Sequence, residues 1–208
     1  MDIKRIHIII VMTLFTFCAS AQNVKMSLGV TGGGIATQML TEPAPSSPMY
    51  TSGYGGAFVT VNPLKKLGVR IGANYSMQGG NYQLDRIPVT VSQSYLNIPV
   101  ALTYQPKSLF SVEAGFYQNV LLNAKLNENG ASKVEVNPDD GALKYNIGAL
   151  VGVSLNLSKA IFVNIRYCYG LSYSYAIMGT GYKSNAITAG LGINLFRNKT
   201  RAFQTFSE

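Results

Sequence analysis

The stretch LKYNIGALVGVSLNL, residues 143–157, alternates apolar side chains with small or polar ones along nearly its whole length. One phase reads Leu, Tyr, Ile, Ala, Val, Val, Leu, Leu, and the other contains mainly Gly, Asn, Ser and Lys. A period of two is the side-chain period of a β-strand, so the stretch predicts a strand with two unlike faces. Residues 67–78 repeat the pattern, with Arg70 in the small and polar phase.

Similar patterns predict eight strands, at residues 24–37, 53–61, 67–78, 94–105, 109–125, 143–157, 160–175 and 184–196. The connections alternate in length: short ones lie near residues 62–66, 105–108 and 157–159, and long ones near residues 38–52, 79–93, 126–142 and 176–183. Short periplasmic turns opposite long external loops are typical of outer-membrane barrels. We therefore predict an all-β protein: an eight-stranded antiparallel up-and-down transmembrane β-barrel with both termini in the periplasm.

The N-terminal residues have the pattern of a secretory signal peptide. Lys4 and Arg5 precede an apolar run from Ile8 to Phe17, and Ala19-Ser20-Ala21 is a small-x-small cleavage site. The run is shorter than the about 20 residues that a membrane-spanning helix needs. We predict a cleaved signal peptide at 1–21, a barrel at 22–196 and a short tail at 197–208, and hence a location in the cell outer membrane.

A soluble barrel of the lipocalin kind shows the same alternation with its apolar face inward, so the other face must decide between the two classes. That face is rich in glycine, for example Gly68, Gly72, Gly148 and Gly152, where a solvated strand favours charged residues. Small residues suit the crowded interior of eight strands, which places the apolar face against lipid. Tyrosines near the strand ends are predicted to form the interfacial girdle: Tyr50, Tyr104, Tyr167, Tyr169, Tyr173 and Tyr175.

Charged residues make up only 12% of the chain, but three of them, Arg70, Glu113 and Arg166, fall at similar depths on the predicted inward face. An unpaired charge in a narrow interior is costly, so we predict that Glu113 pairs with at least one of the arginines. The favoured interpretation of this charge cluster is a structural polar plug, because eight strands leave an interior just wide enough for side chains. The alternative is a narrow gated pore for small solutes.

Basic residues gather at the predicted periplasmic end, whereas most acids lie in the long loops. The basic set is Lys65, Lys66, Lys107, Lys159, Arg197, Lys199 and Arg201. Such a rim suits phospholipid head groups of the inner leaflet or an acidic periplasmic partner, and lipid is the simpler explanation. The net charge of +8 is therefore not interpreted as nucleic-acid binding. An outer-membrane barrel further implies the barrel-assembly machinery as a partner during biogenesis.

The segment Tyr95-Leu96-Asn97-Ile98-Pro99-Val100-Ala101-Leu102-Thr103-Tyr104, with the preceding strand from Leu67 to Ser76 and Gly79-Gly80 after it, resembles PorT-like outer-membrane β-barrel proteins of the Bacteroidota type. The resemblance implies the barrel architecture. It also suggests a role accessory to protein secretion of the type IX kind, with a periplasmic or secretion-system partner. One departure is the C-terminus, where 12 residues follow Phe196, although a terminal aromatic usually closes such barrels.

Catalysis is not expected, because the only histidine, His7, lies in the predicted signal peptide. We predict no catalytic residue, no cofactor and no metal site. The loop carboxylates Asp85, Asp139 and Asp140 are the alternative, as an acid-base pair or Ca²⁺ ligands. The long external loops, notably the proline-containing residues 38–52, could carry adhesion or partner contacts. The favoured function is thus a structural or interaction barrel without enzymatic activity.

Overall fold

The computed structural model describes residues 25–40, 48–84, 87–128, 131–135, 144–173, 175–177 and 180–198. The strands are β1 (Lys25–Leu40), β2 (Tyr50–Asn62), β3 (Leu67–Leu84), β4 (Ile87–Lys107), β5 (Phe110–Glu128), β6 (Ala131–Glu135), β7 (Tyr145–Asn156), β8 (Ile161–Gly170), β9 (Tyr175–Ile177) and β10 (Thr180–Asn198). No helix among these residues is long and apolar enough to span a membrane. The predicted signal peptide lies outside the described residues.

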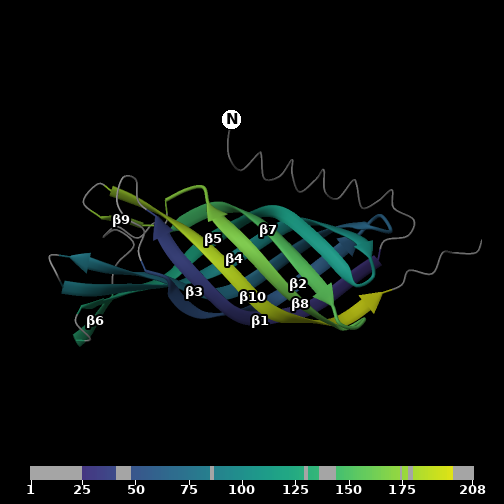
Figure 1. Cartoon of the computed structure of the whole chain (residues 1–208), viewed down its shortest axis with the longest axis horizontal. Helices are drawn as coiled ribbons and strands as arrows, with labels where there is room; N and C mark the ends of the chain where they lie inside the picture. The colour runs from purple at the N-terminus through teal and green to yellow at the C-terminus, as the bar shows by residue number, and fades with distance from the viewer. Residues whose placement is uncertain are drawn as a thin grey trace, which may run out of the picture.

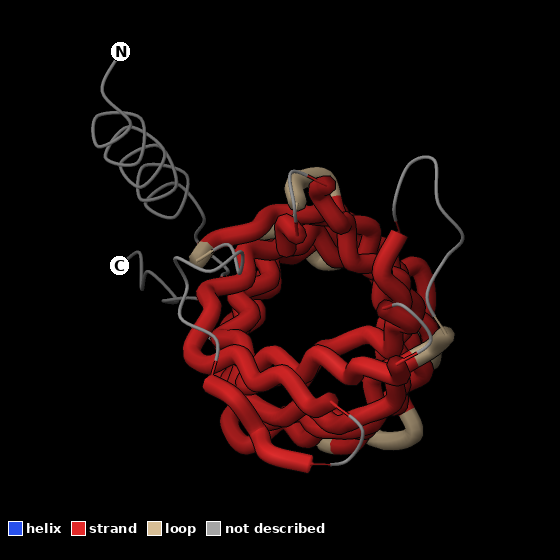
Figure 2. Tube along the Cα trace, turned by 90° about the vertical axis from the view of Figure 1, so that its left-hand side faces the viewer, coloured by secondary structure: helices blue, strands red, loops and turns tan. Residues whose placement is uncertain are grey.

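Eight of these strands form a closed barrel (Figures 1 and 2). Around the barrel the order is β1-β2-β3-β4-β5-β7-β8-β10, every pair is antiparallel, and β10 pairs back with β1. The closing register runs from Met26 opposite Asn198 to Leu40 opposite Lys183. The predicted eight-stranded antiparallel barrel is therefore confirmed. Arg197 and Asn198 belong to its last strand, so the barrel extends two residues into the predicted tail.

The long-loop end contains more sheet than the sequence predicts. The predicted loop at 79–93 is wrong, because β3 and β4 continue as a hairpin paired from Gly79 and Ser92 to Leu84 and Ile87. β6 lies within the predicted loop 126–142 and pairs with β5. β9 runs from Tyr175, the last residue of the predicted strand 160–175, into the predicted loop 176–183, and it pairs with β10. Figure 1 shows these strands projecting from one end of the barrel. Apolar alternation marks only the lipid-facing part of a strand, whereas the hydrogen-bonded ladder continues beyond it.

The outward face of the barrel is apolar. In β7, Tyr145, Ile147 and Val151 are each at least half exposed, whereas the intervening Asn146 and Leu150 are 4% and 2% exposed. The same alternation holds in β3, where Leu67, Ile71, Tyr75 and Met77 are exposed and Asn74 and Ser76 are buried. A solvated barrel would show the opposite sorting, so this distribution is that of a barrel whose outer face meets lipid.

The interior packs large side chains against glycines. A Cβ atom at Gly148 would lie 2.3 Å from the Tyr117 ring, and one at Gly192 would lie 2.0 Å from the Phe162 ring. Each ring therefore occupies the space that a side chain on the neighbouring strand would need. This alternation of small and large residues fills the narrow lumen of eight strands.

Candidate functional site

The strand register brings Glu113 and Arg166 together across β7. Glu113 on β5 and Arg166 on β8 are both paired with the same residue, Gly152. A Cβ atom at Gly152 would lie 2.8 Å from Arg166 Cγ and 2.9 Å from Glu113 Oε1. Because Gly152 has no side chain, the two long side chains can meet over it.

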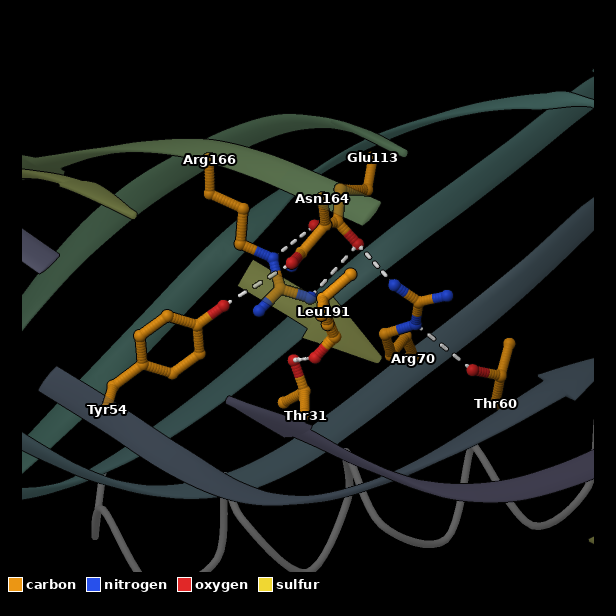
Figure 3. Close-up of polar contacts among 8 residues, drawn as sticks. All are labelled: Thr31, Tyr54, Thr60, Arg70, Glu113, Asn164, Arg166 and Leu191. Carbon is orange, nitrogen blue, oxygen red and sulfur yellow. Dashed lines mark hydrogen bonds and ion pairs between the residues drawn. The ribbon is translucent and has the colours of Figure 1, made fainter. Parts of the chain in front are cut away.

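Glu113 accepts hydrogen bonds from both arginines (Figure 3). Arg166 Nε donates to Glu113 Oε1, and Arg166 Nη2 lies 3.4 Å from Oε2. Arg70 Nη1 donates to Oε2 over 3.2 Å, while Arg70 Nε donates to Thr60 Oγ1 over 3.2 Å. The predicted pairing of Glu113 is therefore present, and with both arginines rather than one.

The charge cluster is buried and is not electrically neutral. The side chains of Arg70, Glu113 and Arg166 are 13%, 2% and 9% exposed. Two guanidinium groups share one carboxylate, so the cluster carries one excess positive charge. Removing charges from water is expensive, and the carboxylate is what makes the burial of two arginines tolerable.

Two phenylalanines hold the guanidinium of Arg70 in place. Its central carbon lies 5.0 Å from the centre of the Phe58 ring and 5.1 Å from that of Phe162. The two rings pack edge to face, with centres 5.6 Å apart. Aromatic faces attract a cation, so the rings contribute to binding Arg70 as well as filling the lumen.

A ladder of asparagines crosses the interior between the charge cluster and the long-loop end. Asn97 donates to Asn119 over 2.6 Å, and Asn119 donates to Asn146 over 2.9 Å. Beside the charge cluster, the Tyr54 hydroxyl donates to Asn164 over 3.3 Å (Figure 3). The three ladder amides come from β4, β5 and β7, so they join neighbouring strands from the inside, whereas the Tyr54–Asn164 bond joins β2 to β8, which are not neighbours in the sheet.

Free space in the lumen is divided very unequally. On the long-loop side of the charge cluster lie cavities of about 30 Å³ and about 10 Å³. The first holds about one or two water molecules. At the short-turn end, a cavity of about 450 Å³ opens, and Arg70 and Phe162 form part of its wall. We call this space the basal cavity.

The tyrosines of the predicted girdle do not all lie on the outer face. Tyr104, Tyr167 and Tyr169 are 42–44% exposed among apolar neighbours, and Tyr173 is 51% exposed just beyond β8. Tyr50 is a correction: it pairs with the fully buried Thr37, and its ring is covered by the β3–β4 hairpin, where a Cβ atom on Gly79 would lie 3.0 Å from the ring and the hydroxyl lies 3.3 Å from Ser92 Oγ. The side chain of Tyr175 lies outside the described part of the structure.

Some interior residues were not singled out from sequence. Phe58 and Phe162 lie on the inward face although they are apolar, so a rule that places every apolar residue on the outer face does not find them. Their position in the phase of Thr60 and Asn164 was the available signal.

Among the described residues, no group of three or more His, Cys, Asp or Glu side chains is arranged to hold a metal ion. Asp85, Asp139 and Asp140 lie outside that part of the chain.

Comparison with solved structures finds the same fold at low sequence identity. Ail, the attachment invasion locus protein of Yersinia pestis, matches with a TM-score of 0.50 and 10% identity, over 85% of this chain and 99% of Ail. Neisserial surface protein A matches with a TM-score of 0.55 and 12% identity, over 81% of this chain and 98% of that protein. No curated protein matches the sequence.

A sequence model of the outer membrane protein β-barrel domain matches residues 20–176. The match covers most of the chain and includes every strand of the charge cluster. It agrees with the closed barrel and its apolar outer face, which together place the protein in the outer membrane. The chain belongs to the outer membrane protein β-barrel domain family.

Proposed function

We propose that this protein is a closed outer-membrane barrel that acts as a structural or interaction protein, without catalytic activity and without a conducting lumen. The observation that carries the proposal is the filled interior. Glu113 with its two arginines, Phe58 and Phe162 occupy one level of the lumen, and the asparagine ladder occupies the next. A barrel of eight strands has little space left for a solute path once such side chains are in place.

The alternative of a narrow gated pore is favoured by one specific feature. The two small cavities and the basal cavity follow one another along the lumen, with Arg70 lining both the basal cavity and its neighbour. A rearrangement of the charge cluster would be needed to join them. Planar-bilayer recording separates the two functions, because a plug gives no conductance steps and a gated pore does.

A structural barrel acts through its surfaces, and one such surface is the sheet that projects at the long-loop end. We propose that this end faces the outside and that both termini face the periplasm, as short turns and long loops are arranged in outer-membrane barrels. The resemblance to PorT-like proteins supports a role accessory to protein secretion, with a partner on the periplasmic side. Adhesion through the external end is the alternative.

Affinity purification of the tagged protein from outer membranes tests the interaction role. Under the secretion proposal we expect a stable periplasmic or secretion-system protein to remain bound after washing in mild detergent. A denatured sample of the same barrel, added to the same extract, controls for contaminants that bind unfolded strands. Recovery of the barrel alone from native membranes would contradict the accessory role and leave a solitary structural one.

A further inference from the structure

The basal cavity is large enough to hold a ligand. Its volume of about 450 Å³ falls within the range of about 300–1,000 Å³ that is usual for small-molecule sites. It is blind, because Arg70 and Phe162 stand at its inner wall, where the charge cluster closes the lumen. A solute can therefore enter only from the short-turn end.

The wall of the basal cavity is basic. Three cationic side chains line it, those of Arg70, Lys159 and Arg197, and its lining residues include no aspartate or glutamate. Glu113 is turned away into the charge cluster and is 2% exposed. Lys159 and Arg197 form no ion pair with any residue that the structure describes. The cavity therefore has unneutralised positive charge facing a polar space.

A β-bulge turns Arg197 into this cavity. Along β10 the inward residues are Gly190, Gly192 and Asn194, so strict alternation would point residue 196 inward and residue 197 outward. On β1, the adjacent residues Leu28 and Gly29 pair with Phe196 and Asn194. Leu195 is therefore the extra, unpaired residue of the bulge. Leu195 and Phe196 both face outward, at 55% and 71% exposure. Bulges commonly re-aim a side chain in this way.

The rim of the basal cavity is held by its own hydrogen bonds. The side-chain amides of Gln105 and Asn156 both donate to the carbonyl oxygen of Ser108, over 3.1 Å and 3.0 Å. In the turn that carries Lys159, the Ser158 hydroxyl accepts from the backbone N–H groups of Ala160 and Ile161. Such a rim is pre-organised, which lowers the ordering cost of binding.

We propose that the basal cavity binds a small phosphate-bearing anion. Lys159 and Arg197 have no carboxylate partner among the described residues, and at Arg70 the charge cluster adds its one excess positive charge. This set suits a ligand with two or more negative charges, which phosphate groups supply at neutral pH. Arginine recognises phosphate oxygens through paired N–H donors, and lysine adds a point charge. The phosphate can belong to a soluble periplasmic solute or to a phospholipid head group at the membrane surface. This site goes beyond a structural or interaction role and does not depend on it.

The test is isothermal titration calorimetry, in which inorganic pyrophosphate is added to the full-length mature barrel in a zwitterionic detergent. We expect saturable one-to-one binding, weakened about tenfold or more in Arg197→Gln, because charge-assisted hydrogen bonds are lost. Lys159→Gln should weaken binding in the same direction. Lys107→Gln is the matched control: it removes one exposed positive charge from a strand at the same end but outside the cavity lining. It should change affinity by no more than about twofold.

Nanodiscs distinguish the two sources of phosphate. If pyrophosphate binds equally well in discs of phosphatidylcholine and of phosphatidylglycerol, the site takes a soluble ligand. If phosphatidylglycerol competes, and Arg197→Gln removes the competition, the site takes a lipid phosphate. Absence of saturable binding, or equal loss of affinity in Arg197→Gln and Lys107→Gln, would overturn the proposal. Heat-modifiable gel mobility confirms that each variant is folded.

Discussion

Replacing Glu113 with glutamine is expected to lower the free energy of unfolding by about 3–5 kcal/mol, the usual cost of removing one partner from a buried ion pair. The variant keeps the shape of the side chain but leaves two buried guanidinium groups without a carboxylate. Arg166 loses both of its contacts with an anion, and Arg70 keeps only Thr60 and the two aromatic rings. Urea unfolding in lipid vesicles, with gel mobility as the readout of the folded fraction, measures the change in the free energy of unfolding.

The matched comparison for this variant is Arg70→Met, which removes the excess positive charge rather than the carboxylate. One arginine then faces one glutamate, and the remaining pair is neutral. Arg70→Met should therefore cost less than Glu113→Gln, although it loses the Thr60 hydrogen bond and the aromatic contacts. A larger loss in Arg70→Met would show that packing against Phe58 and Phe162, not charge balance, stabilises this level of the lumen.

Gly115→Val is expected to destabilise the barrel by about 3 kcal/mol or more, at the upper end of the overpacking range. Gly115 on β5 faces inward opposite Ala101 on β4. A Cβ atom there would lie 2.1 Å from the carbonyl oxygen of Val100 and 2.6 Å from Ala101 Cα. Both are backbone atoms of a paired strand, so the contact is relieved only by moving β4. The folded fraction after refolding into vesicles and the urea midpoint report the effect.

Gly34→Val is the control for this substitution. Gly34 faces outward on β1, and the nearest heavy atom to its added Cβ would be the Ser52 carbonyl oxygen at 4.0 Å. The same change of residue should therefore alter stability by no more than about 0.5 kcal/mol. Equal losses in the two variants would mean that β-propensity or lipid contact, rather than interior space, determines where glycine is needed.

The lipid-facing part of the barrel could be predicted from sequence because two physical constraints act on it together. Lipid requires an apolar outer face, and eight strands require small residues inside, so β3 and β7 carry an unambiguous alternation. The same alternation placed Arg70, Glu113 and Arg166 on one face. Because these three residues lie at similar depths in the barrel, the sequence was enough to predict that the Glu113 carboxylate pairs with an arginine.

Other features could not be predicted because one of these constraints was missing. Residues 50–56, YTSGYGG, have no apolar phase, so periodicity could not show that Tyr50 packs against the β3–β4 hairpin. Beyond the lipid, strands need no apolar face, so the hairpin around residues 79–93 has no alternation that distinguishes it from a loop. The inward position of Arg197 depends on a bulge at Leu195, and a bulge shifts the phase without a mark in the alternation.

Planar-bilayer recording of the refolded mature protein tests most directly whether the lumen is closed. The account predicts no discrete conductance steps for the wild-type barrel, because the charge cluster and two phenylalanines fill one level of the lumen. It predicts the same closed behaviour for the folded fraction of Glu113→Gln, in which the side chains still occupy that level. Reproducible ion-conducting steps in the wild type, or steps that appear only in Glu113→Gln, would contradict the account and identify the charge cluster as a gate.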